Sequence, residues 1–182
     1  LSGIISDQTM IQFKMLNKSK GPAMWSPRCQ SDRMRFAESW RLELEKLHNL
    51  DFWQDMVVEL IESKKSISGV KTMMGITFKS KAVILTNGTF LNGKIHVGEK
   101  QFSGGRSGER SSLGLTAQLE SLGFKSGRMK TGTPPRIDGR SINYSALEED
   151  IGEEAEIGFS FVKKLKLKKQ KSCFIAHTNQ KV

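Results

Sequence analysis

Two loop segments combine glycine-rich backbone with polar or cationic side chains, a combination suited to binding anionic groups. Asn87-Gly88-Thr89 follows an apolar run. Asn and Gly adopt positive φ at little cost, so the chain can turn sharply there and expose backbone N–H groups. Residues 102–112, FSGGRSGERSS, place glycines beside Arg106 and Arg110. Both segments predict an anion-binding site, with an ordinary β-turn and a flexible loop as the alternatives.

A third segment, residues 127–138 (GRMKTGTPPRID), adds cations and hydroxyls on a stiff backbone. Its two prolines restrict the chain, so Arg128, Lys130 and Arg136 can face an anionic substrate at small entropic cost. Thr131 is one of its two hydroxyl side chains. The alternative is a rigid surface turn.

The element that must position the first loop is residues 81–86, KAVILT. The apolar run is too short for a helix and is typical of a strand buried on both faces. Open α/β sheets bind ligands beyond the carboxyl ends of their strands. We therefore expect this strand to deliver Gly88 and Thr89 to a ligand.

Short β-prone segments precede that strand, at residues 53–60, 67–73 and 75–80. Turn-forming residues 63–66 and 74–75 separate them, which predicts a β-meander. Such a meander followed by a strand ending in Thr-x-Gly-Thr resembles the FAD-binding fold of two-dinucleotide flavoproteins.

Elements at both ends of this region are also predicted. Residues 11–16 alternate as a strand does and are followed by a basic loop, 17–22, in which Lys18 and Lys20 are either solvated or in contact with phosphate. Ser26-Pro27 is a favourable helix start, and helical spacing continues to about residue 49. A second helix carries Leu115, Leu119 and Leu122 at helical spacing, with Ser111 or Ser112 as its cap and Gly123 at its end.

Composition suggests an anionic partner. The 182 residues include 29 Lys and Arg against 19 Asp and Glu, a net charge of +10, which favours nucleic acid over a membrane surface. No apolar run reaches membrane-spanning length. The two cysteines lack metal-ligand spacing, so we expect no metal site and a reducing compartment. Acidic residues at 148–156 and lysines at 163–171 predict solvated charge runs, with RNA contact by the lysines as the alternative.

Several unusual motifs occur together: NKSKGPAMWSPR, KAVILTNGTFLNGKIHVG, SGGR, GRMKTGTPPRID and HTN. Their order and spacing resemble the GidA family, also called MnmG. The resemblance implies an α/β protein: part of an FAD-binding, glutathione-reductase-like Rossmann domain with a β-meander at residues 1–98, and part of an inserted substrate- or nucleotide-binding α/β domain at 99–182.

The resemblance also implies a function. Family members are FAD-dependent enzymes that, with an MnmE-type GTPase, install a (carboxymethyl)aminomethyl group at C5 of the tRNA wobble uridine. They use NADH and methylenetetrahydrofolate, form homodimers, and act in the cytoplasm, or in an organelle in eukaryotes.

By motif, Val57 and Ser112 correspond to FAD contacts, and Gly88 and Thr89 to a turn beside the dinucleotide. The resemblance places Arg106, Lys130, Thr131 and Arg136 on a flavin- or tRNA-facing wall, and Arg128 is a further tRNA candidate. No residue is predicted to be catalytic.

The chain departs from the family pattern because it has no GxGxxG motif and lacks the family's cysteine-containing loops and C-terminal helical region. We therefore expect an internal fragment that is inactive alone. A non-enzymatic basic RNA-binding fragment and an inactive truncated gene product are the alternatives.

Overall fold

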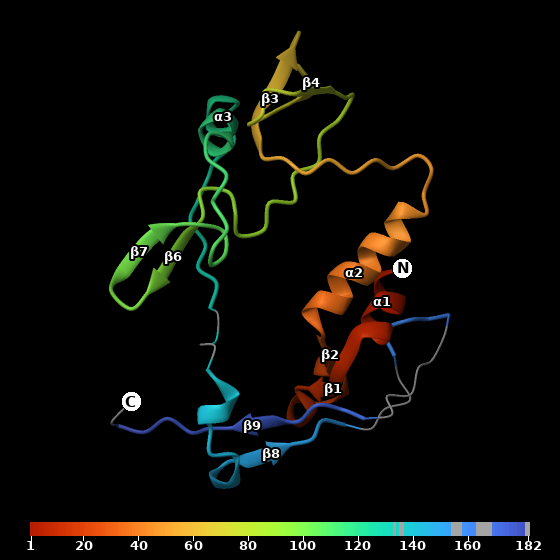
Figure 1. Cartoon of the computed structure of the whole chain (residues 1–182), viewed down its shortest axis with the longest axis vertical. Helices are drawn as coiled ribbons and strands as arrows, with labels where there is room; N and C mark the ends of the chain where they lie inside the picture. Colours follow the sequence, from red (N-terminus) through yellow and green to blue (C-terminus); the bar gives the residue numbers. More distant parts are fainter. Residues whose placement is uncertain (133, 135–136, 154–157, 163–168, 181–182) are drawn as a thin grey trace. The chain divides into compact units, whose positions relative to one another are not determined.

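The computed structural model describes residues 1–132, 134, 137–153, 158–162 and 169–180. The chain divides into two compact units, residues 1–51 with 134–182 and residues 52–133, whose elements are drawn in Figure 1. Each unit is described by itself. The domain division into residues 1–98 and 99–182 stays a prediction.

The first unit contains the N-terminal elements of the chain: α1 (Ser2–Thr9), β1 (Met10–Leu16), β2 (Ser26–Ser31) and α2 (Arg33–Glu45). β1 pairs antiparallel with β2, so the strand predicted at residues 11–16 is confirmed. Short 3₁₀ turns, Lys18–Lys20 and Pro22–Met24, join the two strands.

The predicted helix start at Ser26-Pro27 is wrong. Ser26 and Pro27 begin β2, where Pro27 lies opposite Met15, a position that tolerates proline because it starts a strand of a two-stranded sheet. The helix begins after Asp32, whose side chain accepts from the N–H groups of Met34 and Arg35 at 3.0 and 3.1 Å. An aspartate that satisfies free N–H groups is the better cap.

A small core holds the first unit together. Ile5, Met10 and Phe13 are buried, and buried Asp7 accepts from the N–H groups of Phe159 and Ser160 at 2.7 and 2.9 Å. These bonds tie α1 to a segment more than 150 positions later in the chain. The remaining elements are 3₁₀ turns Gly139–Ser141 and Tyr144–Ala146, and the antiparallel strands β8 (Glu148–Asp150) and β9 (Cys173–Ile175).

Part of the acidic run pairs with lysines of the first unit. Asp150 forms an ion pair with Lys14, and Glu153 forms one with Lys18. Lys18 is therefore paired with a carboxylate in this structure. Glu154 and Glu156 of the acidic run, and residues 163–168 of the lysine run, lie outside the described residues.

The Lys14–Asp150 pair predicts an acid sensitivity of the first unit. The Lys14 ammonium, by its hydrogen bond, lowers the pKa of Asp150 below its usual 3.8. A lowered folded-state pKa adds stability that is complete above the unfolded pKa and is lost as pH falls through the folded one. We expect amide exchange in residues 10–16, corrected for its intrinsic pH dependence, to gain protection in the parent as pH rises from about 2 to about 5. Asp150→Asn should flatten that gain, and an unchanged profile would contradict the assignment.

The second unit contains the predicted meander. β3 (Val57–Ser63), β4 (Ser66–Thr72) and β5 (Thr77–Lys79) form one antiparallel sheet in that order. Lys64 and Lys65, with φ of 49° and 67°, make the two-residue turn between β3 and β4, as hairpins of this length require. The meander is confirmed, with boundaries shifted by a few residues.

A second hairpin and a helix follow the meander. β6 (Lys94–Val97) pairs with β7 (Lys100–Ser103), and α3 (Leu115–Ser121) follows the glycine-rich loop. The helix ends before Gly123, whose φ is 93°, as predicted. Among the described residues, no helix is both long and apolar enough to cross a bilayer.

The predicted buried strand at residues 81–86 is not formed. These residues have no strand assignment, and Ile84 is 86% exposed. A strand buried on both faces needs neighbours for its backbone hydrogen bonds. No strand among the described residues pairs with this segment, so Ile84 and Leu85 stay exposed and Val83 is only half-buried.

Candidate functional site

The two residues matched to FAD contacts, Val57 and Ser112, are joined directly. The Ser112 hydroxyl donates to the Val57 carbonyl at 3.2 Å, although the residues are 55 positions apart. Ser112 is 8% exposed. The structure therefore brings together two residues that the sequence links only through the family motifs.

The register of the meander decides where the Val57 backbone points. Val57 lies opposite Thr72, while the N–H of Met73 donates to the carbonyl of Met56 at 2.8 Å. The Val57–Thr72 pair is therefore a non-hydrogen-bonded pair of the ladder, in which N–H and C=O point away from the partner strand. β3 is an edge strand of its sheet, so the polar groups of Val57 face outward along that edge.

Asp55 stabilises the chain at the entry to β3. Its carboxylate accepts from the N–H of Met56 at 2.7 Å and from that of Met74 at 3.3 Å. The pKa of Asp55 is lowered, first by the Thr72 hydroxyl, with burial opposing and these two N–H groups adding to the shift. The ionised carboxylate thus fixes the backbone next to Val57.

Helix α3 covers another part of the β3 edge. The side-chain amide of Gln118 accepts from the Leu60 N–H at 2.7 Å and donates to the Leu60 carbonyl at 2.6 Å. These two hydrogen bonds replace the donor and the acceptor that a neighbouring strand would offer to the β3 edge. Sequence reasoning missed Gln118. Its only signal in the sequence is a polar side chain on the same predicted helix as Leu115 and Leu119.

The predicted capping role of Ser111 or Ser112 is wrong. The residue before α3 is Gly114, with φ 98° and no side-chain cap, and a Cβ there would lie 3.3 Å from the Val58 carbonyl. The helix begins at Leu115, so Gly114, and neither serine, occupies the cap position. Ser112 bonds to Val57 instead, and the Ser111 hydroxyl contacts that of Ser103 at 2.5 Å.

The predicted turn after residue 86 is present. Gly88 has φ 57°, and the N–H of Phe90 donates to the Asn87 carbonyl at 3.0 Å. The Thr89 hydroxyl donates to the Gly105 carbonyl at 2.7 Å. No heavy atom lies within 4 Å of a Cβ built on Gly88, so the turn is open to an approaching group.

Phe90 organises the contacts between this turn and the neighbouring segments. Its carbonyl accepts from the Ser112 N–H at 2.9 Å, which connects the turn to the Val57–Ser112 pair. A Cβ on Gly105 would overlap the Phe90 ring, and the Arg106 guanidinium lies 5.7 Å from the ring centroid. Only glycine at 105 allows this approach. Phe90 was also missed, because an aromatic residue after a turn carries no specific signal.

The remaining candidates divide into three groups. Arg128 reaches the same cluster, since its guanidinium donates to the Asn92 carbonyl at 3.3 Å. Lys130 and Thr131 lie on exposed chain beyond it. Arg136 lies outside the described residues. The cluster therefore combines Val57, Gly88, Thr89, Arg106, Ser112 and Arg128 within the second unit.

The arrangement fits the adenine side of a dinucleotide cofactor. An outward N–H and C=O on one residue match the acceptor and donor edge of adenine, and the Val57 carbonyl keeps a second lone pair beyond its bond to Ser112. The guanidinium of Arg106 provides a nearby positive charge for an anionic group. In the described part of the chain, no group of three or more His, Cys, Asp or Glu side chains could hold a metal ion.

Comparisons with known proteins show which family the chain resembles. The family model described as "Glucose inhibited division protein A" matches residues 1–182. A tRNA uridine 5-carboxymethylaminomethyl modification enzyme MnmG from Cytophaga hutchinsonii is 58% identical over all of this chain and 30% of its own length. The protein of the same name from Flavobacterium johnsoniae is 58% identical over all of this chain and 29% of its own.

Solved structures show the same relationship. Aquifex aeolicus GidA, in two crystal forms, matches 94% of this chain and 30% of its own chain, with 43% identity and TM-scores of 0.83 and 0.84. The match supports the predicted α/β class and is consistent with part of an FAD-binding domain. The chain spans about 30% of the length of these relatives.

Proposed function

Because the chain belongs to the glucose inhibited division protein A family, we propose that it is part of an FAD-dependent enzyme that modifies tRNA at the wobble uridine. The proposal rests on one structural observation: the hydrogen bond that joins Ser112 to Val57. It unites, on an outward-facing strand edge, the two residues that the family motifs match to FAD contacts.

The residues present would hold one end of the cofactor. Val57 would contact the adenine edge through its backbone, Ser112 would fix the Val57 carbonyl, and the turn at Gly88 and Thr89 would pass beside the dinucleotide. Reduced FAD, when bound, supplies a hydride for the modification. The contribution of this chain is to bind and orient that cofactor.

The finer parts of the proposal follow the family. They are a (carboxymethyl)aminomethyl group added at C5 of the uridine, NADH as reductant, methylenetetrahydrofolate as carbon donor, an MnmE-type GTPase partner, a homodimer, and action in the cytoplasm or an organelle. Arg106, Arg128, Lys130, Thr131 and Arg136 are proposed to contact tRNA or to form a wall of the flavin site. The names of the relatives support tRNA modification.

An FAD titration of the 182-residue chain, monitored by flavin fluorescence with AMP as competitor, tests the proposal. We expect saturable binding that AMP reverses. Ser112→Ala should weaken it about fivefold, because a net hydrogen bond contributes about 1 kcal/mol.

Ser145→Ala is the matched control, since the Ser145 hydroxyl donates to the side chain of Asn143, two residues away, in the other unit. It should bind FAD as the parent does. Absence of binding by a chain that circular dichroism shows to be folded would overturn the adenine-side assignment.

A further inference from the structure

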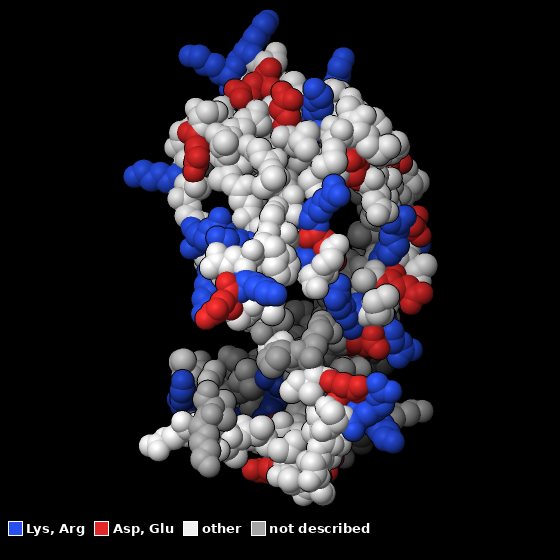
Figure 2. Space-filling model, turned by 60° about the vertical axis from the view of Figure 1, so that its left-hand side comes forward, with Lys and Arg blue, Asp and Glu red and all other residues white. Residues whose placement is uncertain are grey.

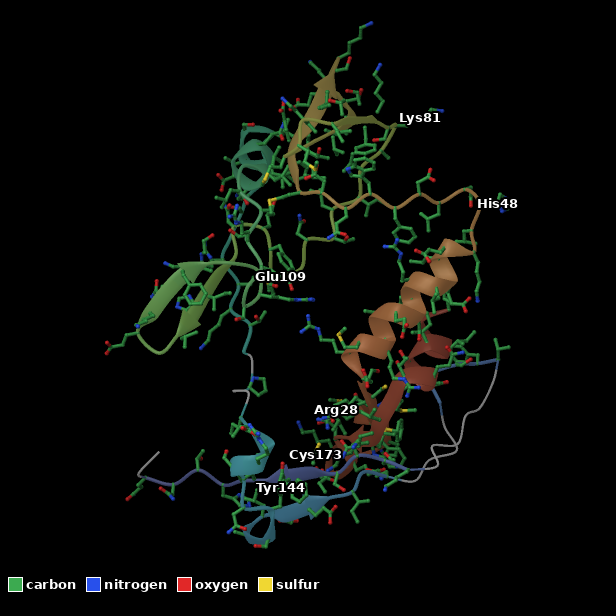
Figure 3. The ribbon with its side chains drawn as sticks, viewed as in Figure 1. Arg28, His48, Lys81, Glu109, Tyr144 and Cys173 are labelled. Carbon is green, nitrogen blue, oxygen red and sulfur yellow. The ribbon has the colours of Figure 1, made fainter. Side chains whose placement is uncertain are left out.

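The far end of the meander carries a hollow that is separate from the Val57–Ser112 pair. Its lining consists of two lysines, three serines and one isoleucine: Ser66, Ile67, Ser68, Lys79, Ser80 and Lys81. The hollow has a volume of about 490 Å³ and lies along β4 and the end of β5. Figure 3 shows Lys81 just beyond the sheet at this end. Ammonium and hydroxyl groups on one surface are donors suited to phosphate oxygens.

The lysines of this hollow are not neutralised. Within the described part of the chain, no carboxylate lies within ion-pair distance of Lys79 or Lys81. The nearby Lys71 is different, because its ammonium lies 3.9 Å from the Glu59 carboxylate. The sequence contains no acidic residue between Glu62 and Glu99, so β4, β5 and the chain that follows them carry no carboxylate, and the two glutamates of this sheet, Glu59 and Glu62, lie on β3.

Further positive charge continues from the hollow to the hairpin tip. Lys64 and Lys65 form the turn directly before Ser66. Figure 2 shows Lys and Arg side chains projecting at this end of the meander, with acidic side chains interspersed below them. The spread of cations along one end favours an extended polyanion over a single small anion.

From these features we propose that the end of the meander is an RNA-binding surface, in which Lys79 and Lys81 contact backbone phosphates. The inference rests on the proposed function, which makes tRNA the RNA concerned. It adds an RNA contact to the second unit, at residues that are not among the candidate cofactor or tRNA residues described above.

Anisotropy of a fluorescein-labelled tRNA transcript, titrated with the chain at several salt concentrations, tests the surface. We expect Lys79→Ala/Lys81→Ala to weaken binding about tenfold at about 0.1 M salt. The slope of log affinity against log salt should fall in magnitude by about 1 to 2, because each lost phosphate contact releases one fewer counterion.

The matched control is Lys94→Ala/Lys100→Ala, which removes the same charge from exposed positions of the β6–β7 hairpin. Equal weakening and equal slopes for the two double variants would overturn the inference, as would binding to anionic lipid vesicles but not to tRNA. The FAD titration is independent of both lysine pairs, so it distinguishes failure of this surface from failure of the proposed function.

Discussion

Replacing Gly93 with alanine is expected to destabilise the second unit by about 3 kcal/mol and to weaken FAD binding more than tenfold. A Cβ on Gly93 would overlap the backbone carbonyl oxygens of Thr89 and Gly104. Neither is the end of a flexible side chain, so the turn and the glycine-rich loop would have to separate. Overpacking of this kind costs about 1 to 3 kcal/mol.

The effect should reach the cofactor site because the same backbone positions Ser112. Gly93 donates to Phe90 and accepts from Gly104 at 3.1 and 3.0 Å, while the Phe90 carbonyl also accepts from the Ser112 N–H. Amide exchange in residues 87–105 and the FAD titration would measure the two consequences. Gly127→Ala is the control, since a Cβ there meets no atom within 4 Å. Equal behaviour of the two alanine variants would refute the packing argument.

The turns are the part of the fold that was predictable from sequence. Lys64, Lys65, Gly88 and Gly123 adopt positive φ, each in a turn or at a helix end that the sequence predicted. Local chemistry determines such turns, because the conformation depends on only two or three residues. The meander was predictable for the same reason, since its strands pair with their sequence neighbours.

The elements that failed depend on distant partners. Residues 81–86 have the composition of a buried strand, but pairing decides whether such a strand forms, and sequence pattern does not supply the partner. At Ser26-Pro27, the local helix-start signal lost to pairing with β1. The relatives are more than three times as long as this chain, and we propose that in such a longer protein additional strands pair with residues 81–86.

The candidate site shows the same division. The family motifs identified Val57 and Ser112 as candidates. Neither composition nor periodicity indicated that these residues, 55 positions apart, form a hydrogen bond with each other. Gln118 was not predicted because its hydrogen bonds to Leu60 form only when α3 packs on β3. A residue whose own side chain suits a ligand can be recognised from the sequence. A residue that acts by holding another residue in place can be recognised only once the fold is known.

Gln118→Ala tests the positioning role directly and is expected to destabilise the β3 edge by about 2 kcal/mol. The substitution would leave the N–H and C=O of buried Leu60 without their partners, and an unsatisfied buried group costs about 1 to 3 kcal/mol. In hydrogen exchange, residues 57–63 should exchange about 30-fold faster, while residues 10–16 of the other unit serve as an internal reference. Gln101→Ala, at an exposed position on β7, should leave both segments unchanged. If Gln118→Ala exchanges like the parent, water satisfies Leu60 and α3 is not what holds this edge. If protection is lost and FAD affinity falls with it, the β3 edge must be closed for Val57 to present its backbone to the cofactor.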